Sequence, residues 1–239
     1  MKAQPLPIVL AAMAALTCSA AWPQTDRPQA GGTDRSWRQE FDLSGCTLAT
    51  TGRNRYFVLE PGFQLALEGG STRVQITVLD ETRQVAGVET RVVEEREWKG
   101  GQLYEVSRNY FALCQQTGDV FYFGEDVDYY ENGRVVRHDG AWLAGTGGNR
   151  AGLIMPGAPR VGMRYYQEVA PGVAMDRAEI VSLDETCETP AGRFSGCLKV
   201  KEDTPLEAGA GEYKYHAPDV GLVRDEDLRL TRYGFVGRR

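Results

Sequence analysis

The sequence has few histidines and no excess of positive charge. Its 239 residues carry 27 Lys and Arg against 33 Asp and Glu, for a formal net charge of −6, and only two histidines are present. A protein that binds nucleic-acid phosphates needs a basic surface, so this negative net charge argues against a nucleic-acid partner. The two histidines, His138 and His216, leave little choice for imidazole chemistry.

Long apolar runs and helical periodicity are also missing. After the first residues, no stretch reaches the ~20 apolar residues that a membrane-spanning helix requires, so no transmembrane segment is expected once a signal is removed. No segment repeats apolar residues at i, i+3, i+4 and i+7 over three turns. Short runs of Val, Ile, Tyr and Phe instead alternate with Gly-containing turns from Arg53 onward, which predicts a single all-β domain over residues 53–239.

The N-terminus has the pattern of an export signal. Lys2 precedes a short apolar run from Ile8 to Leu16, and small residues follow at 19–21, so we predict a signal peptide over residues 1–21. The mature protein is then expected in the periplasm or outside the cell, and lipidation of Cys18 stays open. Residues 22–52 begin with a polar, Pro- and Gly-containing stretch and are predicted to be a flexible leader.

Four cysteines remain after this cleavage, and none form the C-x-x-C pairs typical of zinc sites. An even number in an exported chain favours disulfides. Cys187 and Cys197 flank "ETPAGRFSG", so a hairpin centred near Gly192 is expected to pair them. Cys46–Cys114 then follows by elimination. Free buried thiols are the alternative.

A repeated motif indicates an internal duplication. "LDET" occurs at 79–82 and again at 183–186, and similar strand and turn patterns surround both copies. We predict two similar meanders, over 61–126 and 161–227, separated by an insert over 127–160. Asn132-Gly133 in the insert is typical of a type I′ hairpin turn. The expected fold is a curved antiparallel meander sheet, forming either a half-barrel or a closed barrel.

The segment "YHAPDVG" places His216 three residues before Asp219. This pair suits a catalytic arrangement, but Pro218 and Gly221 favour a bend between two strands. The corresponding part of the first meander has Leu113 and Cys114 and no histidine. No G-x-S-x-G motif accompanies the pair, so a bend is the preferred interpretation and a hydrolase using His216 is an alternative.

One acidic run supplies candidate calcium ligands, namely Glu125, Asp126, Asp128 and Glu131. Calcium binds six to eight oxygen atoms, and carboxylates provide them. The spacing does not match an EF-hand loop, and a solvated hairpin edge is the ordinary explanation. No other cofactor is indicated.

Aromatic residues are frequent on the predicted strands. Adjacent pairs such as Tyr129-Tyr130 and Tyr165-Tyr166 must point to opposite faces of a sheet, so one member need not be in the core. Cross-strand packing accounts for many such residues. The candidates for lining a ligand-binding concave face are Tyr122, Tyr130, Trp142, Tyr166 and Tyr215.

Several segments resemble an uncharacterised family of exported bacterial β-proteins. The resemblance covers "YFGEDV" (122–127), "YENGRVV" (130–136), "GLIMPGAPRVGMRYYQE" (152–168), "FSGCLKVKEDTPLE" (194–207) and "KYHAPDVGLV" (214–223). The C-terminal part is similar to periplasmic curved-sheet proteins, among which half-barrels cradle lipoprotein acyl chains. The resemblance implies a curved sheet and export, and it brings no catalytic residues.

These observations together favour a non-enzymatic envelope protein that binds an apolar or amphipathic small molecule on the concave face of its sheet. A structural module that docks another envelope protein through exposed tyrosines or an edge strand is the alternative.

Overall fold

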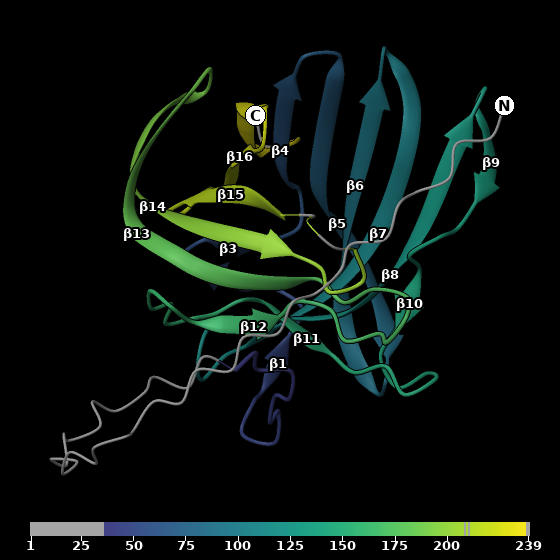
Figure 1. The fold of residues 1–239 in the computed structure, drawn as a ribbon, viewed down its shortest axis with the longest axis vertical. Helices are drawn as coiled ribbons and strands as arrows, with labels where there is room; N and C mark the ends of the chain where they lie inside the picture. The colour runs from purple at the N-terminus through teal and green to yellow at the C-terminus, as the bar shows by residue number, and fades with distance from the viewer. Residues whose placement is uncertain (1–35, 208, 210, 238–239) are drawn as a thin grey trace, which may run out of the picture. The chain divides into compact units, whose positions relative to one another are not determined.

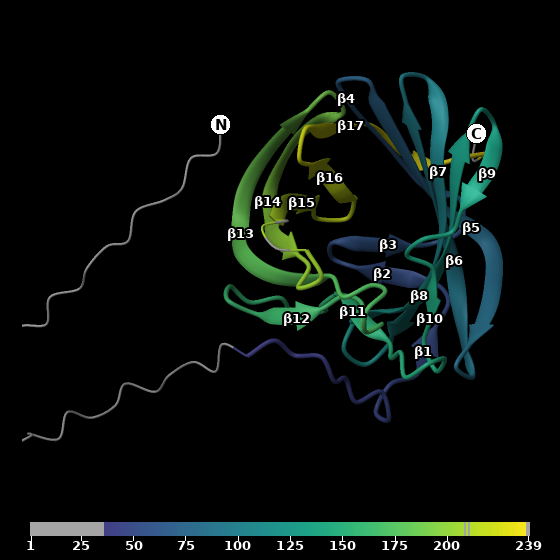
Figure 2. The same ribbon diagram turned by 45° about the vertical axis from the view of Figure 1, so that its right-hand side comes forward.

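The computed structural model describes residues 36–207, 209 and 211–237, and these residues form an all-β fold (Figure 1). A 15-stranded antiparallel sheet curves around a separate two-stranded hairpin (Figure 2). This confirms the predicted curved antiparallel meander. No helix in the described part of the chain is long and apolar enough to span a membrane. The predicted signal peptide, Cys18 and the leader up to residue 35 lie outside the described residues.

Two consecutive meanders make up most of the sheet. Each strand pairs with the next one in the chain, as expected for strands joined by short Gly-containing turns. The first meander contains β4 (Phe63–Gly69), β5 (Thr72–Val85), β6 (Val88–Lys99), β7 (Gln102–Cys114) and β8 (Val120–Glu131). The second contains β12 (Arg164–Tyr166), β13 (Arg177–Thr189), β14 (Gly192–Asp203), β15 (Gly211–Ala217) and β16 (Gly221–Asp225).

The last strand joins the two meanders. β17 (Leu228–Phe235) follows β16 and pairs antiparallel with β4, for example at Leu230 opposite Leu67. The path of the sheet therefore runs from β10 (Trp142–Leu143) to β12 and has two ends. The sheet is open, so the alternative of a closed barrel is wrong.

The insert between the meanders packs onto the last strand of the first one. β9 (Arg134–Arg137), β10 and β11 (Gly152–Met155) all pair with β8. Asn132 and Gly133 both have positive φ, at 52° and 74°, and connect Glu131 to its partner Arg134. This is the predicted type I′ turn, which requires positive φ at both central residues.

The two meanders begin in the same way. The Gly62 amide donates to the Val78 carbonyl at 2.8 Å, and the Gly162 amide donates to the Ile180 carbonyl at 2.8 Å. Both glycines have nearly the same positive φ, 84° and 85°. The shared strand order and entry geometry agree with a duplicated unit, although common ancestry of the two halves stays a prediction.

Residues 36–52 differ from the flexible leader that the sequence suggested for residues 22–52. Trp37 packs against Tyr166, and Phe41 packs against Phe121. β1 (Leu48–Ala49) pairs with the end of β7, and a disulfide joins Cys46 to Cys114. These contacts supply the buried aromatic surface and the covalent bond that hold a polar segment in place.

The Cys46–Cys114 disulfide was predicted, but the expected bond between Cys187 and Cys197 is absent. Both are buried free thiols, and the two side chains hydrogen-bond to each other. The hairpin turns at Pro190 and Ala191, so Thr189 faces Gly192 and Cys187 faces Phe194. Cys197 lies opposite Glu185 instead of Cys187, because the turn is centred before Gly192.

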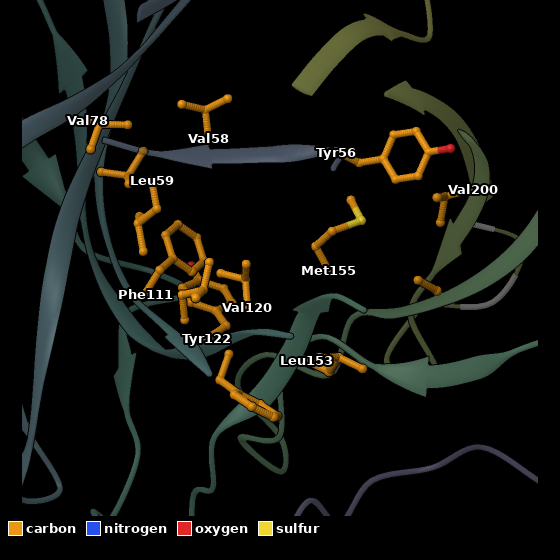
Figure 3. Packing of buried hydrophobic residues seen from close by; sticks show 14 of the residues in the cluster. Tyr56, Val58, Leu59, Val78, Phe111, Val120, Tyr122, Leu153, Met155 and Val200 are labelled. Carbon is orange, nitrogen blue, oxygen red and sulfur yellow. The ribbon is translucent and has the colours of Figure 1, made fainter. Parts of the chain in front are cut away.

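A short hairpin lies against the concave side of the sheet. β2 (Gly52–Asn54) and β3 (Phe57–Leu59) pair only with each other. Tyr56, Val58 and Leu59 are buried, with Tyr56 on the side of Val200 and Leu59 on the side of Val78 (Figure 3). The hairpin thus fills space that the curved sheet cannot fill with its own side chains.

Asn54 anchors this hairpin. Its buried amide donates to the Gly118 carbonyl at 2.8 Å and to the Pro156 carbonyl at 3.0 Å, and its side-chain oxygen accepts from the Tyr56 amide at 2.7 Å. The hairpin also reaches the second meander, because the Tyr56 hydroxyl donates to the Gly196 carbonyl at 3.2 Å. One side chain therefore ties the hairpin to the first meander and the insert.

Replacing Asn54 with Ala is expected to lower the free energy of unfolding by about 2–4 kcal/mol, because it leaves two carbonyls and one amide without their partner in the interior. Urea unfolding of the purified protein measures the change. Asn149→Ala is the control, since that amide makes one longer bond of 3.3 Å to the Leu143 carbonyl. Equal effects of the two substitutions would contradict the anchoring role of Asn54.

The disulfide encloses a long loop, with 68 residues separating Cys46 from Cys114. A Cys46→Ser, Cys114→Ser double variant is expected to lose about 2–5 kcal/mol of stability, because the loop gains freedom in the unfolded chain. Reduction of the wild-type protein with dithiothreitol should produce a similar loss in urea unfolding and no further loss in the double variant. An unchanged midpoint would refute this.

Candidate functional site

The hairpin does not fill the whole concave side of the sheet, and a cavity of about 380 Å³ remains between them. Side chains from both meanders, from β3, from β11 and from the segment that follows β12 line this concave cavity. Its volume lies within the range of about 300–1,000 Å³ that is usual for small-molecule sites.

One part of the cavity wall is apolar. The inward positions of β4, β5 and β6 alternate along the strands, as a half-buried sheet requires. Two hairpin residues, two residues of β11, one of β7 and two at or just before the start of β16 complete this wall. Its members are Phe57, Val58, Phe63, Leu65, Ile76, Val78, Val93, Phe111, Ile154, Met155, Val220 and Leu222.

The other part of the wall is polar and carries many ionisable groups. Six carboxylates line it, from the β6–β8 region, from the segment after β12 and from β14. These are Glu95, Glu105, Glu125, Glu168, Asp176 and Glu202. Ser107, Asn109, Tyr122, Gln167, Lys214 and His216 also face the cavity. The cavity is therefore amphipathic, with carboxylates beside aliphatic and aromatic side chains, as in the cross-strand pair Ile76 and Glu95.

A bulge in β8 places two of these groups together. Asn109 pairs with Glu125 and Phe111 pairs with Tyr122, so β8 contains one more residue between these two pairs than β7 does. The extra residue turns both Tyr122 and Glu125 toward the cavity, although strict alternation would point them to opposite faces. Gly124 makes the bulge possible, because its φ is 131° and a Cβ there would lie 2.2 Å from the Trp142 carbonyl oxygen.

Lys214 is the centre of an ion cluster at one side of the cavity. Its ammonium lies 2.9 Å from Glu202, 3.0 Å from Glu212 and 3.7 Å from Asp225. Burial alone would lower the pKa of Lys214, but the three carboxylates outweigh burial and hold it well above its ordinary value. Burial raises the pKa of Glu202, but Lys214 and the hydrogen bond from Gln167 together lower it more, so this pKa ends below its ordinary value. Gln167 donates that hydrogen bond at 2.8 Å.

The remaining carboxylates of the cavity titrate differently. Burial raises the pKa of Glu95 to about 7. Burial and then the charge of Asp176 raise the pKa of Glu168 to about 8, although the Trp142 indole donates to it at 3.4 Å. Burial and the neighbouring Glu168 hold the pKa of Glu125 well above its ordinary range. Glu95 and Glu168 therefore exchange between the acid and the carboxylate near neutral pH.

His216 and Asp219 do not form the catalytic pair that their spacing allowed. Asp219 lies in the turn between β15 and β16 with φ of 62°, as the predicted bend requires, and its amide donates to the Arg55 carbonyl. His216 instead lines the cavity. Burial lowers its pKa to about 4, and its buried Nδ1 has no hydrogen-bonding partner among the described residues.

The five aromatic candidates do not all lie at the cavity. Tyr122 lines the cavity, and Trp142 packs against it with ring centroids 5.4 Å apart. Tyr166 instead packs against Trp37, and Tyr215 lies between Lys199 and Arg224. Tyr130 is opposite Val135 in the β8–β9 pair and is likewise not among the lining residues.

The four candidate calcium ligands do not converge. Glu125 faces the cavity, whereas Asp126 accepts from Tyr110 at 2.6 Å on the other face of β8. Asp128 pairs with His138 at 2.8 Å, and Glu131 is exposed at the hairpin end. Within residues 36–207, 209 and 211–237, no three His, Cys, Asp or Glu side chains are grouped so that they could hold a metal ion.

Sequence reasoning missed most of the polar wall. Glu95, Glu105, Glu168, Asp176, Glu202 and Lys214 sit on separate strands and segments, and no local motif links them. Charged residues between apolar neighbours, as in Tyr104-Glu105-Val106, were the available signal. That signal cannot be separated from an exposed strand face without knowing which alternate residues point inward.

Lys214→Met is expected to destabilise the protein by about 1–3 kcal/mol, because it leaves the half-buried Glu202, Glu212 and Asp225 close together without their cation. Lys201→Met, on the exposed side of the adjacent strand, is the matched control and should change stability by less than about 0.5 kcal/mol. Urea unfolding at pH 7 compares the two. A tolerant Lys214→Met variant would show that the cluster is not held by its ammonium.

No protein-family model, curated protein or solved structure significantly matches this chain. The chemistry of the site therefore has to be argued from its own geometry.

Proposed function

We propose that this protein is an exported envelope protein that binds a small amphipathic molecule in its concave cavity, without catalysing a reaction on it. The observation that carries the proposal is the cavity of about 380 Å³, with an apolar wall and a polar wall facing the same space. A purely apolar ligand would leave the carboxylates unpaired, and a purely polar ligand would leave the apolar side chains in contact with water.

The export part of the proposal rests on the sequence. The N-terminal pattern of Lys2, an apolar run and small residues is typical of a signal peptide. The Cys46–Cys114 disulfide is compatible with an oxidising compartment such as the periplasm.

The hydrolase alternative has less support. A catalytic histidine needs a nucleophile and an orienting partner within hydrogen-bond reach. The buried Nδ1 of His216 has no such partner in the described chain, and Asp219 is directed elsewhere by the turn. A module that docks another envelope protein is the second candidate, and the exposed Tyr213 and Tyr233 are the side chains that it would use.

Binding can be tested with N-phenyl-1-naphthylamine, a neutral fluorophore that brightens in apolar surroundings. We expect saturable binding to the wild-type protein. Ser107→Trp, which places a large ring in the cavity wall, should weaken binding at least ~tenfold. Arg108→Trp is the matched control, because it changes the next residue of β7 on the opposite face and should leave binding within about twofold.

Circular dichroism must show that both variants are folded. Equal binding by Ser107→Trp and Arg108→Trp would place the fluorophore outside the cavity. Absence of saturable binding to the wild-type protein, or turnover of a ligand that requires His216, would count against the proposed function.

A further inference from the structure

The polar wall of the cavity has more negative groups than its cations can neutralise. Lys214 is the one lysine or arginine among the lining residues, and it is already shared by Glu202, Glu212 and Asp225. Glu95, Glu125, Glu168 and Asp176 form no ion pair with a Lys, Arg or His of the described chain. Lys214 is close enough to lower the pKa of Glu95 and of Asp176, but a single ammonium cannot balance all of these carboxylates, so the wall carries an excess of acidic groups.

His216 adds an independent feature of the same wall. Its ring lines the cavity, is neutral at physiological pH, and leaves the buried Nδ1 without a partner among the described residues. A buried polar atom without a hydrogen bond is rare in folded proteins and calls for an explanation. The neutral ring brings no positive charge to the wall, so His216 does not offset the carboxylates there.

Buried carboxylates without a cation have two ways to avoid the cost of an isolated charge. They bind protons, or they pair with a positive ligand. A metal ion would need several carboxylate oxygens around one point, and no such group exists in the part of the chain that the structure describes. The carboxylates are instead spread over β6, β8 and the segment after β12, around a space of about 380 Å³.

The apolar wall favours one kind of cation over another. Phe57, Ile76 and Phe111 belong to the same cavity as Glu95 and Glu125. A small hydrated cation would leave these apolar side chains in contact with water. An ammonium group attached to a hydrocarbon body satisfies both walls at once.

We propose that the concave cavity is a binding site for an amphipathic organic cation, with its ammonium group among Glu95, Glu125 and Glu168 and its hydrocarbon body against the apolar wall. This inference rests on the proposed function, because it names the head group of the ligand. It goes beyond that function by excluding anionic and neutral amphiphiles as preferred ligands.

The test uses three probes with the same eight-carbon chain on the full exported protein, namely octylammonium, octanol and octanoate. Isothermal titration calorimetry at pH 8 should show octylammonium binding at least ~tenfold more tightly than the other two. The amine stays protonated at that pH, since its pKa is close to the lysine value of about 10.4. Glu168→Gln should weaken octylammonium at least ~threefold without changing octanol.

Asp80→Asn is the matched control, because that side chain is 92% exposed on the outer part of β5 and should leave all three affinities unchanged. If octanol or octanoate binds as tightly as octylammonium, the preference for a cation is wrong while amphipathic binding stands. If none of the three binds and N-phenyl-1-naphthylamine also fails, both proposals are wrong. Displacement of octylammonium by equimolar calcium would assign the wall to a metal and overturn the inference.

The pH dependence gives an independent readout. Burial raises the pKa of Glu95 to about 7 and that of Glu168 to about 8, and it also raises the pKa of Glu125, so carboxyl groups of the cavity hold protons near neutral pH. A bound ammonium ion stabilises the ionised form of the carboxyl groups, so binding releases these protons. The affinity for octylammonium should therefore rise from pH 6 to pH 9. Octanol affinity should stay flat over this range.

The other titratable groups that line the cavity or contact Lys214 do not reverse this direction. Burial raises the pKa of Glu105 and Asp176, and it raises that of Asp225 to about 6. Glu202 and Lys214 stay charged and His216 stays neutral across the range, while Glu212 remains paired with Lys214. Calorimetry in buffers with different ionisation enthalpies measures the protons released. Proton uptake, or affinity that falls as pH rises, would overturn the inference.

Discussion

The structure depends on the way in which the β2–β3 hairpin occupies the concave side of a single open sheet. A curved sheet with two meanders presents inward side chains that cannot reach one another across the hollow, and an empty hollow would expose them to water. The side chain of Asn54 holds the hairpin in the hollow with three hydrogen bonds, and the Tyr56 hydroxyl donates to a carbonyl of β14. Because the hairpin fills only part of the hollow, it also defines the cavity that remains.

Much of the fold was predictable because its signals are local. Asn132-Gly133 specifies a type I′ turn through the φ values that the two residues tolerate, and the structure has that turn. The consecutive strands of both meanders follow from short apolar runs and glycine turns. The position of the hairpin and the pairing of β17 with β4 were not predictable, since both depend on distant segments. Asn54 bonds to Gly118, 64 residues away, and Thr231 bonds to Ala66, 165 residues away.

The site was harder to predict, because it depends on which face each residue occupies. The bulge at Gly124 reverses the expected alternation, so Tyr122 and Glu125 share the cavity and Asp126 leaves it. A glycine inside an aromatic strand was the visible signal, but its consequence depends on the close approach of Trp142. The Cys187–Cys197 pairing was wrong for a similar reason, since a turn centred before Gly192 changes every partner along the hairpin.

The two meanders contribute unequally to the charge of the cavity. The second meander brings Lys214 together with Glu202 and Asp225, so its charges are largely balanced within β14, β15 and β16. The first meander brings Glu95, Glu105 and Glu125 and no cation to the same space. A fold that needed these positions only for stability could hold apolar side chains there, since buried charges without partners destabilise. Burial raises the pKa of Glu125 and of Glu95, because it removes solvent from their charged forms. The imbalance is therefore best explained as one half of an interaction whose positive half comes from a ligand.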